Sequence, residues 1–216
     1  MDFSLPSVYP ILDSSFIPAA DRAAFLDQLG RSLSGAGVRL IEYRNKSGSD
    51  AEVLADARIL RAAMPATTLV MDDRVDVALA AGFDGVHVDA GDLPVLEARR
   101  LLALDRSGRE SIVGTSASDE VQLLEALAGG ADYIAFGPVY PTTTKQTSAP
   151  PIGLEGVRRF RELAGAATVL VAAAGITLET APAVLEAGAT AVAVSAAIFR
   201  NRDPAAEFRR WAAVLG

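Results

Sequence analysis

The amino-acid sequence predicts an α/β protein in which eight parallel strands and the helices that follow them close into one (β/α)8 barrel, or TIM barrel, over residues 1–216. Three observations support this single-domain prediction. Segments with strand and helix character alternate along the whole chain. The predicted strands are short apolar runs, as expected where both faces of a strand are buried. The fingerprint G-x-G-x-x-G, typical of an open doubly wound sheet, is absent after the first strand.

The first four strand–helix units are recognised by their apolar spacing and by the residues that end them. The spacing of Phe25, Leu29 and Leu33 predicts the first helix, which the glycines after it stop. Pro65 ends the second helix, and Gly82 closes the third. The predicted strands of this half cover residues 8–12, 38–43, 68–71 and 85–88, and the predicted helices cover residues 19–34, 50–64, 75–81 and 94–104.

The second half repeats the pattern. Gly129 and Gly130 cap the fifth helix, and Gly188 follows the seventh. The predicted strands cover residues 111–114, 131–136, 168–172 and 191–194, and the predicted helices cover residues 119–128, 154–163, 178–186 and 204–215. No second domain, linker or low-complexity tract interrupts the alternation.

Charge and composition exclude several classes of function. The chain has 20 Lys and Arg against 27 Asp and Glu, and this acidic balance argues against a nucleic-acid partner. No apolar run approaches the length of a membrane span and no leader pattern opens the chain, so we expect a cytoplasmic protein without a membrane partner. The absence of Cys excludes thiolate chemistry. The single histidine, His87, alternates with apolar residues, which favours a packed, hydrogen-bonded role over a catalytic one.

A long polar loop after the sixth predicted strand is the strongest local signal. Gly137-Pro138 ends the strand, and three threonines and Lys145 follow. Loops of this length inside a compact domain are usually binding loops, lids or disordered segments. Hydroxyl groups and one mobile cation suit phosphate oxygens. Taken alone, the same residues fit a solvated surface loop.

Polar residues also follow the other strands, at the barrel end where chemistry occurs in this fold. They are Glu42, Arg44 and Lys46 after the second strand, Asp72 and Asp73 after the third, Asp89 and Asp92 after the fourth, Thr115 and Ser116 after the fifth, Gly175 after the seventh and Ser195 after the eighth. The opposite ends are mostly Gly, Ala and Thr turns. This asymmetry predicts a functional site on the carboxyl-end rim.

The residue types on this rim suit a phosphorylated ligand. Arg44, Lys46 and Lys145 could together hold a diphosphate. Asp73 and Asp92 supply the hard oxygen ligands that suit Mg²⁺ shared with phosphate oxygens. Small residues after the last two strands fit the usual phosphate site of a barrel, where backbone N–H groups bind the anion.

Each rim residue also has a structural interpretation. Asp72 and Asp73 could cap the following helix, and Ser195 could be an N-cap. The basic residues after the second strand could be solvated loop charges, and Asp89 is best explained as a turn residue. Only the joint placement on one rim favours function.

Several motifs together make the sequence resemble the thiamine phosphate synthase (thiamine phosphate pyrophosphorylase) family nearly end to end. The most specific is residues 132–145, DYIAFGPVYPTTTK. The others are YRNK at 43–46, DRVDVALA at 73–80, GVHV at 85–88, GTS at 114–116, PPIGLEG at 150–156 and VAVS at 192–195.

The resemblance implies an Mg²⁺-dependent transferase on a (β/α)8 barrel, commonly a homodimer. The family joins 4-amino-5-hydroxymethyl-2-methylpyrimidine diphosphate to hydroxyethylthiazole phosphate, giving thiamine phosphate and diphosphate. Diphosphate is understood to leave first, and the thiazole nitrogen then attacks the pyrimidine-stabilised cation. This step needs a neutralised leaving group and exclusion of water, but no general base or protein nucleophile. Phe208 and Trp211 on the last helix could belong to a dimer interface or to barrel packing.

The same resemblance implies roles for individual residues. Arg44, Lys46 and Lys145 would hold the diphosphate, Asp73 and Asp92 would hold Mg²⁺, and the backbone around Gly175 and Ser195 would hold the thiazole phosphate with Thr142 and Thr144. Ser116 would touch the pyrimidine or the diphosphate. The implied catalytic set is Arg44, Lys46, Ser116 and Lys145. The implied substrate-binding set is Glu42, Arg44, Lys46, Asp72, Ser116, Thr142, Thr144, Lys145, Gly175 and Ser195.

Four positions depart from the family pattern. Glu42 replaces the usual Gln, Asp72 replaces Asn, Asp89-Ala90 replaces Gly-Gln, and Ala174 replaces Gly. The two carboxylates are expected to weaken diphosphate binding unless a metal or a proton compensates. Two alternatives to the synthase therefore remain: a paralogue resembling the thiazole tautomerase, and a non-catalytic barrel that binds a phosphorylated ligand. The retained basic residues and aspartates of the rim favour the synthase.

Overall fold

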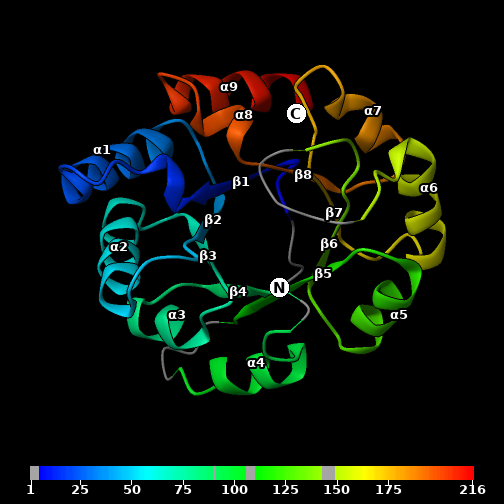
Figure 1. Ribbon diagram of the computed structural model, residues 1–216, viewed down its shortest axis with the longest axis horizontal. Coiled ribbons are helices and arrows are strands. Elements are labelled where there is room, and N and C mark those ends of the chain that lie inside the picture. Colours follow the sequence, from blue (N-terminus) through cyan, green and yellow to red (C-terminus); the bar gives the residue numbers. More distant parts are fainter. Residues whose placement is uncertain (1–4, 90, 106–109, 143–148) are drawn as a thin grey trace.

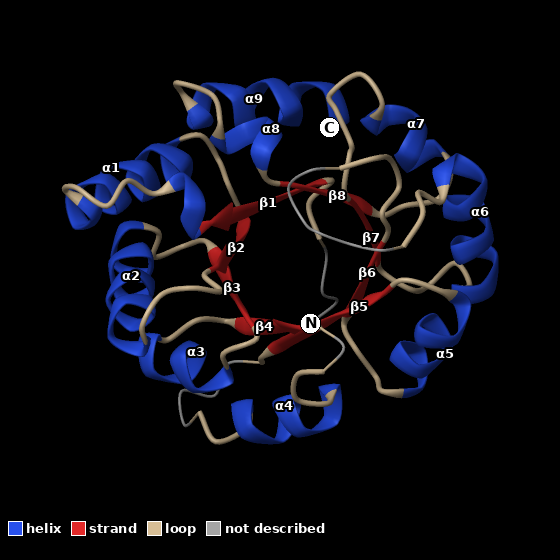
Figure 2. Ribbon diagram, viewed as in Figure 1, coloured by secondary structure: helices blue, strands red, loops and turns tan. Residues whose placement is uncertain are grey.

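A computed structural model describes residues 5–89, 91–105, 110–142 and 149–216. Eight parallel strands form a closed barrel in the order β1 to β8, with β8 paired to β1, and the helices form a ring around them (Figure 1, Figure 2). The strands are β1 (Val8–Asp13), β2 (Leu40–Arg44), β3 (Thr68–Asp72), β4 (Gly85–Val88), β5 (Ile112–Ala117), β6 (Tyr133–Phe136), β7 (Leu170–Ala173) and β8 (Ala191–Val194). The predicted (β/α)8 barrel is confirmed.

The outer ring follows the predicted alternation. Its helices are α1 (Arg22–Gly35), α2 (Asp50–Ala63), α3 (Val75–Ala81), α4 (Val95–Leu102), α5 (Glu120–Ala128), α6 (Gly153–Ala164), α7 (Ala181–Glu186), α8 (Ala196–Phe199) and α9 (Pro204–Leu215). Side-chain caps fix several starts: Ser49 accepts from the backbone of α2, Asp119 from that of α5 and Asp203 from that of α9. Among the described residues, no helix has both the length and the apolar character needed to cross a bilayer.

Three local differences from the sequence-based expectation affect the site or its borders. Strand β5 extends to Ala117, so Ser116 lies within the strand instead of after it. Helix α1 begins only at Arg22, because Asp21 adopts a left-handed backbone with φ of 54°. The short 3₁₀ helix η1 (Ser14–Phe16) and helix α8 were not predicted, since one turn shows no helical periodicity.

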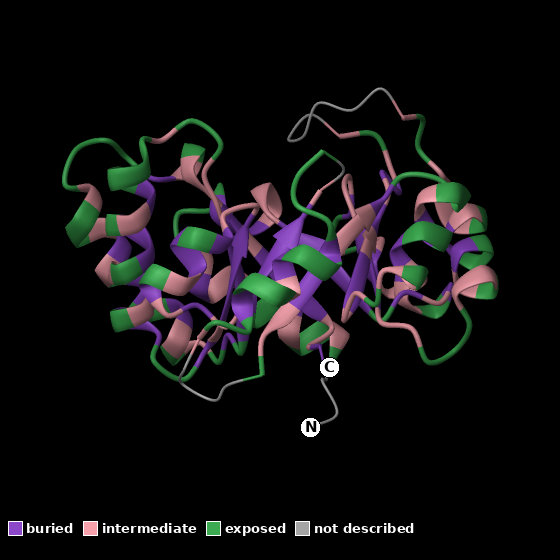
Figure 3. Ribbon diagram, turned by 90° about the horizontal axis from the view of Figure 1, so that it is seen from below, coloured by how far each residue is buried: buried purple, intermediate pink, exposed green. Residues whose placement is uncertain are grey.

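Two apolar cores hold the barrel together. One fills the space between strands and helices and includes Phe208 and Trp211 of α9, which are 5% and 1% exposed. These two side chains therefore serve barrel packing. The second core fills the barrel interior and includes Tyr9, Tyr133 and Val171. Burial is concentrated along the strands, and the exposed residues lie on the outer helices and loops (Figure 3).

The amino ends of the strands are fastened by a contact that recurs before β4, β6 and β8. A side chain in the turn before a strand accepts the backbone N–H of the preceding strand and also binds an arginine from a helix. The three sets are Asp84 with Leu69 and Arg61, Asp132 with Val113 and Arg99, and Thr190 with Leu170 and Arg161. The polar groups at this end therefore serve stability, while those at the carboxyl end are available for chemistry.

Candidate active site

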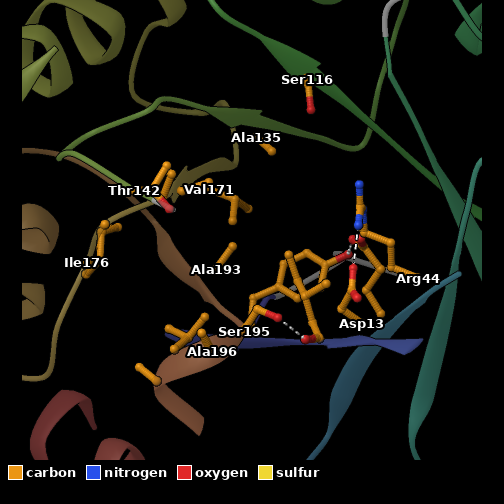
Figure 4. A pocket seen from close by; sticks show the side chains of 18 of the residues that line it. Asp13, Arg44, Ser116, Ala135, Thr142, Val171, Ile176, Ala193, Ser195 and Ala196 are labelled. Atoms are coloured by element: carbon orange, nitrogen blue, oxygen red, sulfur yellow. Dashed lines mark hydrogen bonds and ion pairs between the residues drawn. The ribbon is translucent and has the colours of Figure 1, made fainter. Parts of the chain in front are cut away.

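A cavity of about 340 Å³ lies at the carboxyl ends of the strands (Figure 4). Seven of the predicted substrate-binding residues line it: Glu42, Arg44, Asp72, Ser116, Thr142, Gly175 and Ser195. Its floor is apolar and consists largely of small or β-branched side chains that include Ile11, Val171 and Ala193. Thr144 and Lys145 lie outside the described residues, so the structure leaves their predicted roles untested.

The basic residues of the rim are paired with carboxylates. Arg44 at the end of β2 donates to Asp13 at the end of β1, directly across the strand pair. The Nε atom of Arg44 is also 3.9 Å from Oδ2 of Asp72. Lys46 Nζ lies 2.8 Å from the same Asp72 oxygen and also pairs with Asp73. An anionic ligand must therefore compete with acidic partners for both cations.

These contacts decide between the two interpretations of Asp72 and Asp73 at the end of β3, a helix cap or a rim residue. Arg74 occupies the N-cap position of α3, and no side chain there makes a capping hydrogen bond. Asp72 and Asp73 instead direct their carboxylates toward Lys46. Asp72 is buried, and burial raises its pKa although Lys46 acts in the opposite direction. The pair is therefore part of the rim electrostatics and does not cap the helix.

Glu42 occupies a deeper position than Arg44 on the same strand. The two residues are two positions apart, so their side chains lie on the same face of β2, about 6.6 Å apart along the strand. Glu42 is only 3% exposed, and its Oε2 accepts the hydroxyl hydrogen of Tyr9 at 2.8 Å. Burial raises the pKa of Glu42, and the nearby Asp72 carboxylate raises it further.

A chain of hydrogen bonds runs from Glu42 through the barrel interior to the cavity wall. The hydroxyl oxygens of Tyr9 and Tyr133 are 2.6 Å apart. Tyr133 Oη lies 3.1 Å from His87 Nδ1, and His87 Nε2 lies 2.9 Å from Ser116 Oγ. Burial raises the pKa of both tyrosines well above the usual value, so both keep their protons. These hydrogen bonds link side chains of strands β2, β1, β6, β4 and β5, in that order.

Gly114 makes room for this chain. A Cβ atom at Gly114 would lie 2.0 Å from Cζ and 2.4 Å from the hydroxyl oxygen of Tyr133. The Tyr133 ring therefore crosses β5 at a position that only glycine leaves open. The ring also stacks on His87, with centroids 5.5 Å apart. The position of His87 is thus fixed by packing as well as by hydrogen bonds.

The opposite side of the cavity is formed by backbone. Gly175 has φ of 72°, and a Cβ there would come within 2.5 Å of the Tyr140 carbonyl oxygen, so the loops after β6 and β7 approach closely. The preceding Ala174 also adopts a left-handed backbone, with φ of 70°. Ser195 occupies the N-cap position of α8, but its side chain makes no capping hydrogen bond, and its hydroxyl donates to the Ile11 carbonyl at 2.7 Å. The first amides of α8 and the turn at Gly175 border the cavity.

The predicted Mg²⁺ ligands differ in their suitability. Asp73 Oδ1 is buried without a hydrogen-bond partner, and such an orphaned oxygen is suited to a cation. Asp92 is exposed, and its Oδ2 accepts the backbone N–H of Asp89 at 2.9 Å. Within the described part of the chain, no group of three or more acidic, His or Cys side chains is arranged so that it could hold a metal ion by itself. The donor set therefore fits Mg²⁺ only if phosphate oxygens and water complete the coordination.

Several cavity residues were not predicted as functional. Asp13 and Tyr9 on β1 line the cavity, as do His87 and Asp89. The expectation that His87 is packed and hydrogen-bonded is confirmed, but its Nε2 also faces Ser116 at the cavity wall. The position of Asp13 at a strand end could have indicated its place. A tyrosine within an apolar strand gives no such signal, because it fits a core position equally well.

The cavity can thus hold anionic groups at two places, next to Arg44 and next to the amide-rich loops. Comparisons with known proteins agree with this geometry. The family model described as thiamine monophosphate synthase (TMP-TENI) matches residues 8–198. The chain belongs to the thiamine monophosphate synthase family. The predicted family membership and enzyme class are therefore confirmed.

Individual members of the thiamine monophosphate synthase family match almost the full chain. The thiamine-phosphate synthase of Koribacter versatilis (strain Ellin345) is 40% identical over 206 residues, which are 94% of each chain. That of Methanospirillum hungatei JF-1 is 37% identical over 210 residues, covering 96% of this chain and 97% of the relative. The structure of thiamine phosphate pyrophosphorylase from Pyrococcus furiosus superposes with a TM-score of 0.80 at 30% identity, covering 97% of both chains. These relatives favour the synthase over the tautomerase-like and ligand-binding alternatives.

Proposed function

We propose that the 340 Å³ cavity is the active site at which this thiamine-phosphate synthase joins its two substrates. The substrates are 4-amino-5-hydroxymethyl-2-methylpyrimidine diphosphate and hydroxyethylthiazole phosphate, and the products are thiamine phosphate and diphosphate. One observation supports the proposal most strongly. Arg44 and Asp13 lie on one side of the cavity, Thr142 and Ile176 lie on the other, and the apolar floor between them suits two rings (Figure 4).

The first step breaks the bond between the pyrimidine methylene carbon and the diphosphate oxygen, and the electron pair leaves with diphosphate. Arg44 and Lys46 neutralise this leaving group when they exchange their present carboxylate partners for phosphate oxygens. Lys145, which lies between β6 and α6 in the sequence, supplies a third cation. The Asp13 and Asp72 carboxylates hold the two rim cations in place before the substrate binds.

The second step forms the bond between the thiazole nitrogen and the methylene carbon. It requires that the two rings meet while water is excluded, and the small apolar side chains of the floor provide such a surface. The thiazole phosphate binds the backbone around Gly175 and Ser195 together with Thr142 and Thr144. No protein nucleophile takes part, in agreement with a chain that lacks Cys and has one His. Ser116 lies in the cavity wall and contacts the substrate.

Asp73 and Asp92 would hold Mg²⁺ together with the diphosphate. The partnerless Oδ1 of Asp73 supports this assignment. When bound, Mg²⁺ would neutralise part of the charge that develops on the departing diphosphate. Asp92 would have to release the backbone N–H of Asp89 before it could contribute.

We also propose that the chain acts as one TIM-barrel domain, forms a homodimer and works in the cytoplasm. Six of the seven large hydrophobic side chains that are exposed in the described residues lie on or next to α4 and α5: Leu93, Leu96, Leu101, Leu104, Val121 and Leu124. Large apolar side chains exposed on two consecutive helices of the ring favour a protein interface. Light scattering should report a dimer that Leu96→Glu together with Leu124→Glu converts to a monomer. A monomeric wild type would contradict the homodimer.

The synthase proposal is tested with purified protein, both substrates and Mg²⁺, while thiamine phosphate and diphosphate are followed together. Equal amounts of the two products, lost when Mg²⁺ is chelated, are expected. A folded protein that binds the thiazole phosphate but forms no product would contradict the proposal.

A further inference from the structure

We propose that Glu42 determines, through Tyr9, Tyr133 and His87, the direction in which the Ser116 hydroxyl points, so that Ser116 presents only its oxygen lone pairs to the substrate. Within this series of hydrogen bonds, Glu42, Tyr9, Tyr133 and His87 act as positioning residues for Ser116, which touches the substrate. The inference rests on the proposed role of the cavity as the synthase active site. It assigns the Ser116 contact to one part of one substrate.

The two tyrosines can each donate only one hydrogen, because a phenol has a single O–H. Tyr9 donates its hydrogen to Glu42 Oε2, so it can only accept from Tyr133 across the 2.6 Å contact. Tyr133 has then used its own hydrogen on Tyr9. Its oxygen must therefore accept from His87 Nδ1, 3.1 Å away.

The contact with Tyr133 determines the tautomer of the His87 imidazole. Since Nδ1 of His87 carries a hydrogen, a neutral ring leaves Nε2 bare as an acceptor. The Ser116 hydroxyl, 2.9 Å from Nε2, therefore donates its hydrogen to the ring. Asp89 Oδ1 lies farther from Nε2, at 3.5 Å, and competes only if Nε2 is protonated. When the His87 ring is neutral, every hydrogen of these hydrogen bonds thus points toward Glu42.

The orientation of the Ser116 hydroxyl limits which substrate group it can bind. A hydroxyl that has given its hydrogen to His87 can accept but not donate. Diphosphate oxygens offer no hydrogen at neutral pH, so they are poor partners for it. The exocyclic amino group of the pyrimidine carries N–H donors, and positive charge develops on the adjacent methylene carbon. The direction of the hydroxyl therefore favours the aminopyrimidine over the diphosphate as the partner of Ser116.

The buried series of hydrogen bonds from Glu42 to Ser116 is suited to fixing the direction of the Ser116 hydroxyl. Tyr9 and Tyr133 are at most 1% exposed, so solvent has little access to their hydroxyls. Gly114 admits the Tyr133 ring, and the ring stacks on His87. What position 42 must supply is an acceptor for Tyr9. A glutamine there can still accept, whereas a leucine cannot.

His87 makes the proposal directly observable, because it is the only histidine in the chain. Protein labelled with ¹⁵N-histidine, with any purification tag removed, gives signals from one ring, and nitrogen shifts distinguish a protonated from a bare ring nitrogen. Burial lowers the pKa of His87, but Asp89, Glu42 and Asp72 raise it on balance, so the spectrum is recorded at the alkaline end of the stable range. We expect Nδ1–H with bare Nε2 in the wild type and in Glu42→Gln. Glu42→Leu and Tyr133→Phe should shift the ring toward Nε2–H.

A double-mutant cycle tests whether the hydrogen bonds from Glu42 to His87 act on catalysis through Ser116. Tyr133→Phe should lower kcat/KM about three- to tenfold, as expected for one lost hydrogen bond. In a Ser116→Ala background the same substitution should have almost no further effect. Tyr43→Phe is the matched control, because Tyr43 is equally buried but bonds Asp56, outside the chain of hydrogen bonds. It should change neither the His87 spectrum nor kcat/KM.

The results of these experiments distinguish a failure of the inference about Ser116 from a failure of the proposed synthase function. An Nε2–H or doubly protonated ring in the alkaline wild type would overturn the inference, as would equal Tyr133→Phe effects in both backgrounds. An active wild type that Ser116→Ala leaves unchanged would overturn the role of Ser116 and the inference with it. If the wild type forms no thiamine phosphate, the proposed function fails, and with no reaction for Ser116 to serve the recognition part of the inference is overturned.

Discussion

The ammonium group of Lys46 lies 2.8 Å from Oδ2 of Asp72, a carboxylate that is 5% exposed at the end of β3. Asp72 stands where the family usually has Asn. The lysine that should meet the diphosphate is therefore bound to a negative charge of the protein. Such a contact keeps Lys46 at the rim but competes with the substrate for it.

Replacing Asp72 by the uncharged isostere should favour the substrate in this competition. We expect Asp72→Asn to lower KM for the pyrimidine diphosphate about two- to fivefold. The effect is limited because Lys46 is exposed, and solvent screens its attraction to the diphosphate. Asp76→Asn, which removes an exposed partner of Arg74 on α3, is the control and should leave KM unchanged. A KM that rises in Asp72→Asn would mean that the carboxylate assists binding.

Glu42 should make stability depend on pH. Burial raises its folded-state pKa above the unfolded value near 4.5, so the folded protein favours the protonated form, and stability is lost as pH rises from that value through the raised pKa. Glu42→Gln removes this loss and keeps an acceptor for Tyr9. Thermal unfolding should therefore show that the free energy of unfolding of Glu42→Gln, relative to that of the wild type, rises with pH. The rise is about 1.4 kcal/mol for every pH unit between the unfolded-state and the folded-state pKa of Glu42. A difference that is constant with pH would show that Glu42 ionises normally.

Ala174 should carry a backbone cost. Its φ of 70° lies in the left-handed region, where a Cβ atom is unfavourable by about 1–2 kcal/mol, and the family usually has Gly there. We expect Ala174→Gly to raise the free energy of unfolding by about 1 kcal/mol in denaturant titrations, after the entropy of glycine is subtracted. Ala173→Gly, at the neighbouring strand residue without positive φ, should instead destabilise. Destabilisation in both variants would contradict the strain at Ala174.

Asp73 should determine the dependence on Mg²⁺. Since its Oδ1 has no hydrogen-bond partner, Asp73→Asn should raise the Mg²⁺ concentration for half-maximal rate about tenfold or more. Chelation should abolish activity in the wild type, and added Mg²⁺ should restore it. The same titration on Asp76→Asn should match the wild type. If Asp73→Asn also matches it, the metal is bound elsewhere.

The fold and the composition of the rim follow from local patterns in the sequence. Short apolar strands alternating with amphipathic helices predict a parallel sheet, and the absent G-x-G-x-x-G fingerprint favours a closed barrel over an open sheet. Parallel strands bring their carboxyl ends to one rim. Arg44, Asp72 and Ser195 are therefore placed by the strand that precedes each of them. The roles of Lys145 and Thr144 depend on loop conformation, on which strand positions give no information.

The interior chain of hydrogen bonds could not be predicted from the sequence. Tyr9 and Tyr133 are 124 positions apart, and each fits an apolar strand as a core residue. Their contact depends on barrel closure and on the missing side chain of Gly114. For the same reason the sequence correctly predicts a packed His87, while its contact with Ser116 requires the pairing of β4 with β5.

The most direct test of the carboxyl-end active site compares the two arginines at opposite ends of β2. Arg44→Ala should lower kcat/KM for thiamine phosphate formation about 100-fold, because it removes a preorganised cation from the leaving diphosphate. Arg39→Ala changes an exposed arginine just before the amino end of the strand and should leave kcat/KM within about twofold of the wild type. Equal kinetics in folded Arg44→Ala and Arg39→Ala protein would contradict the proposal that the chemistry takes place in this cavity.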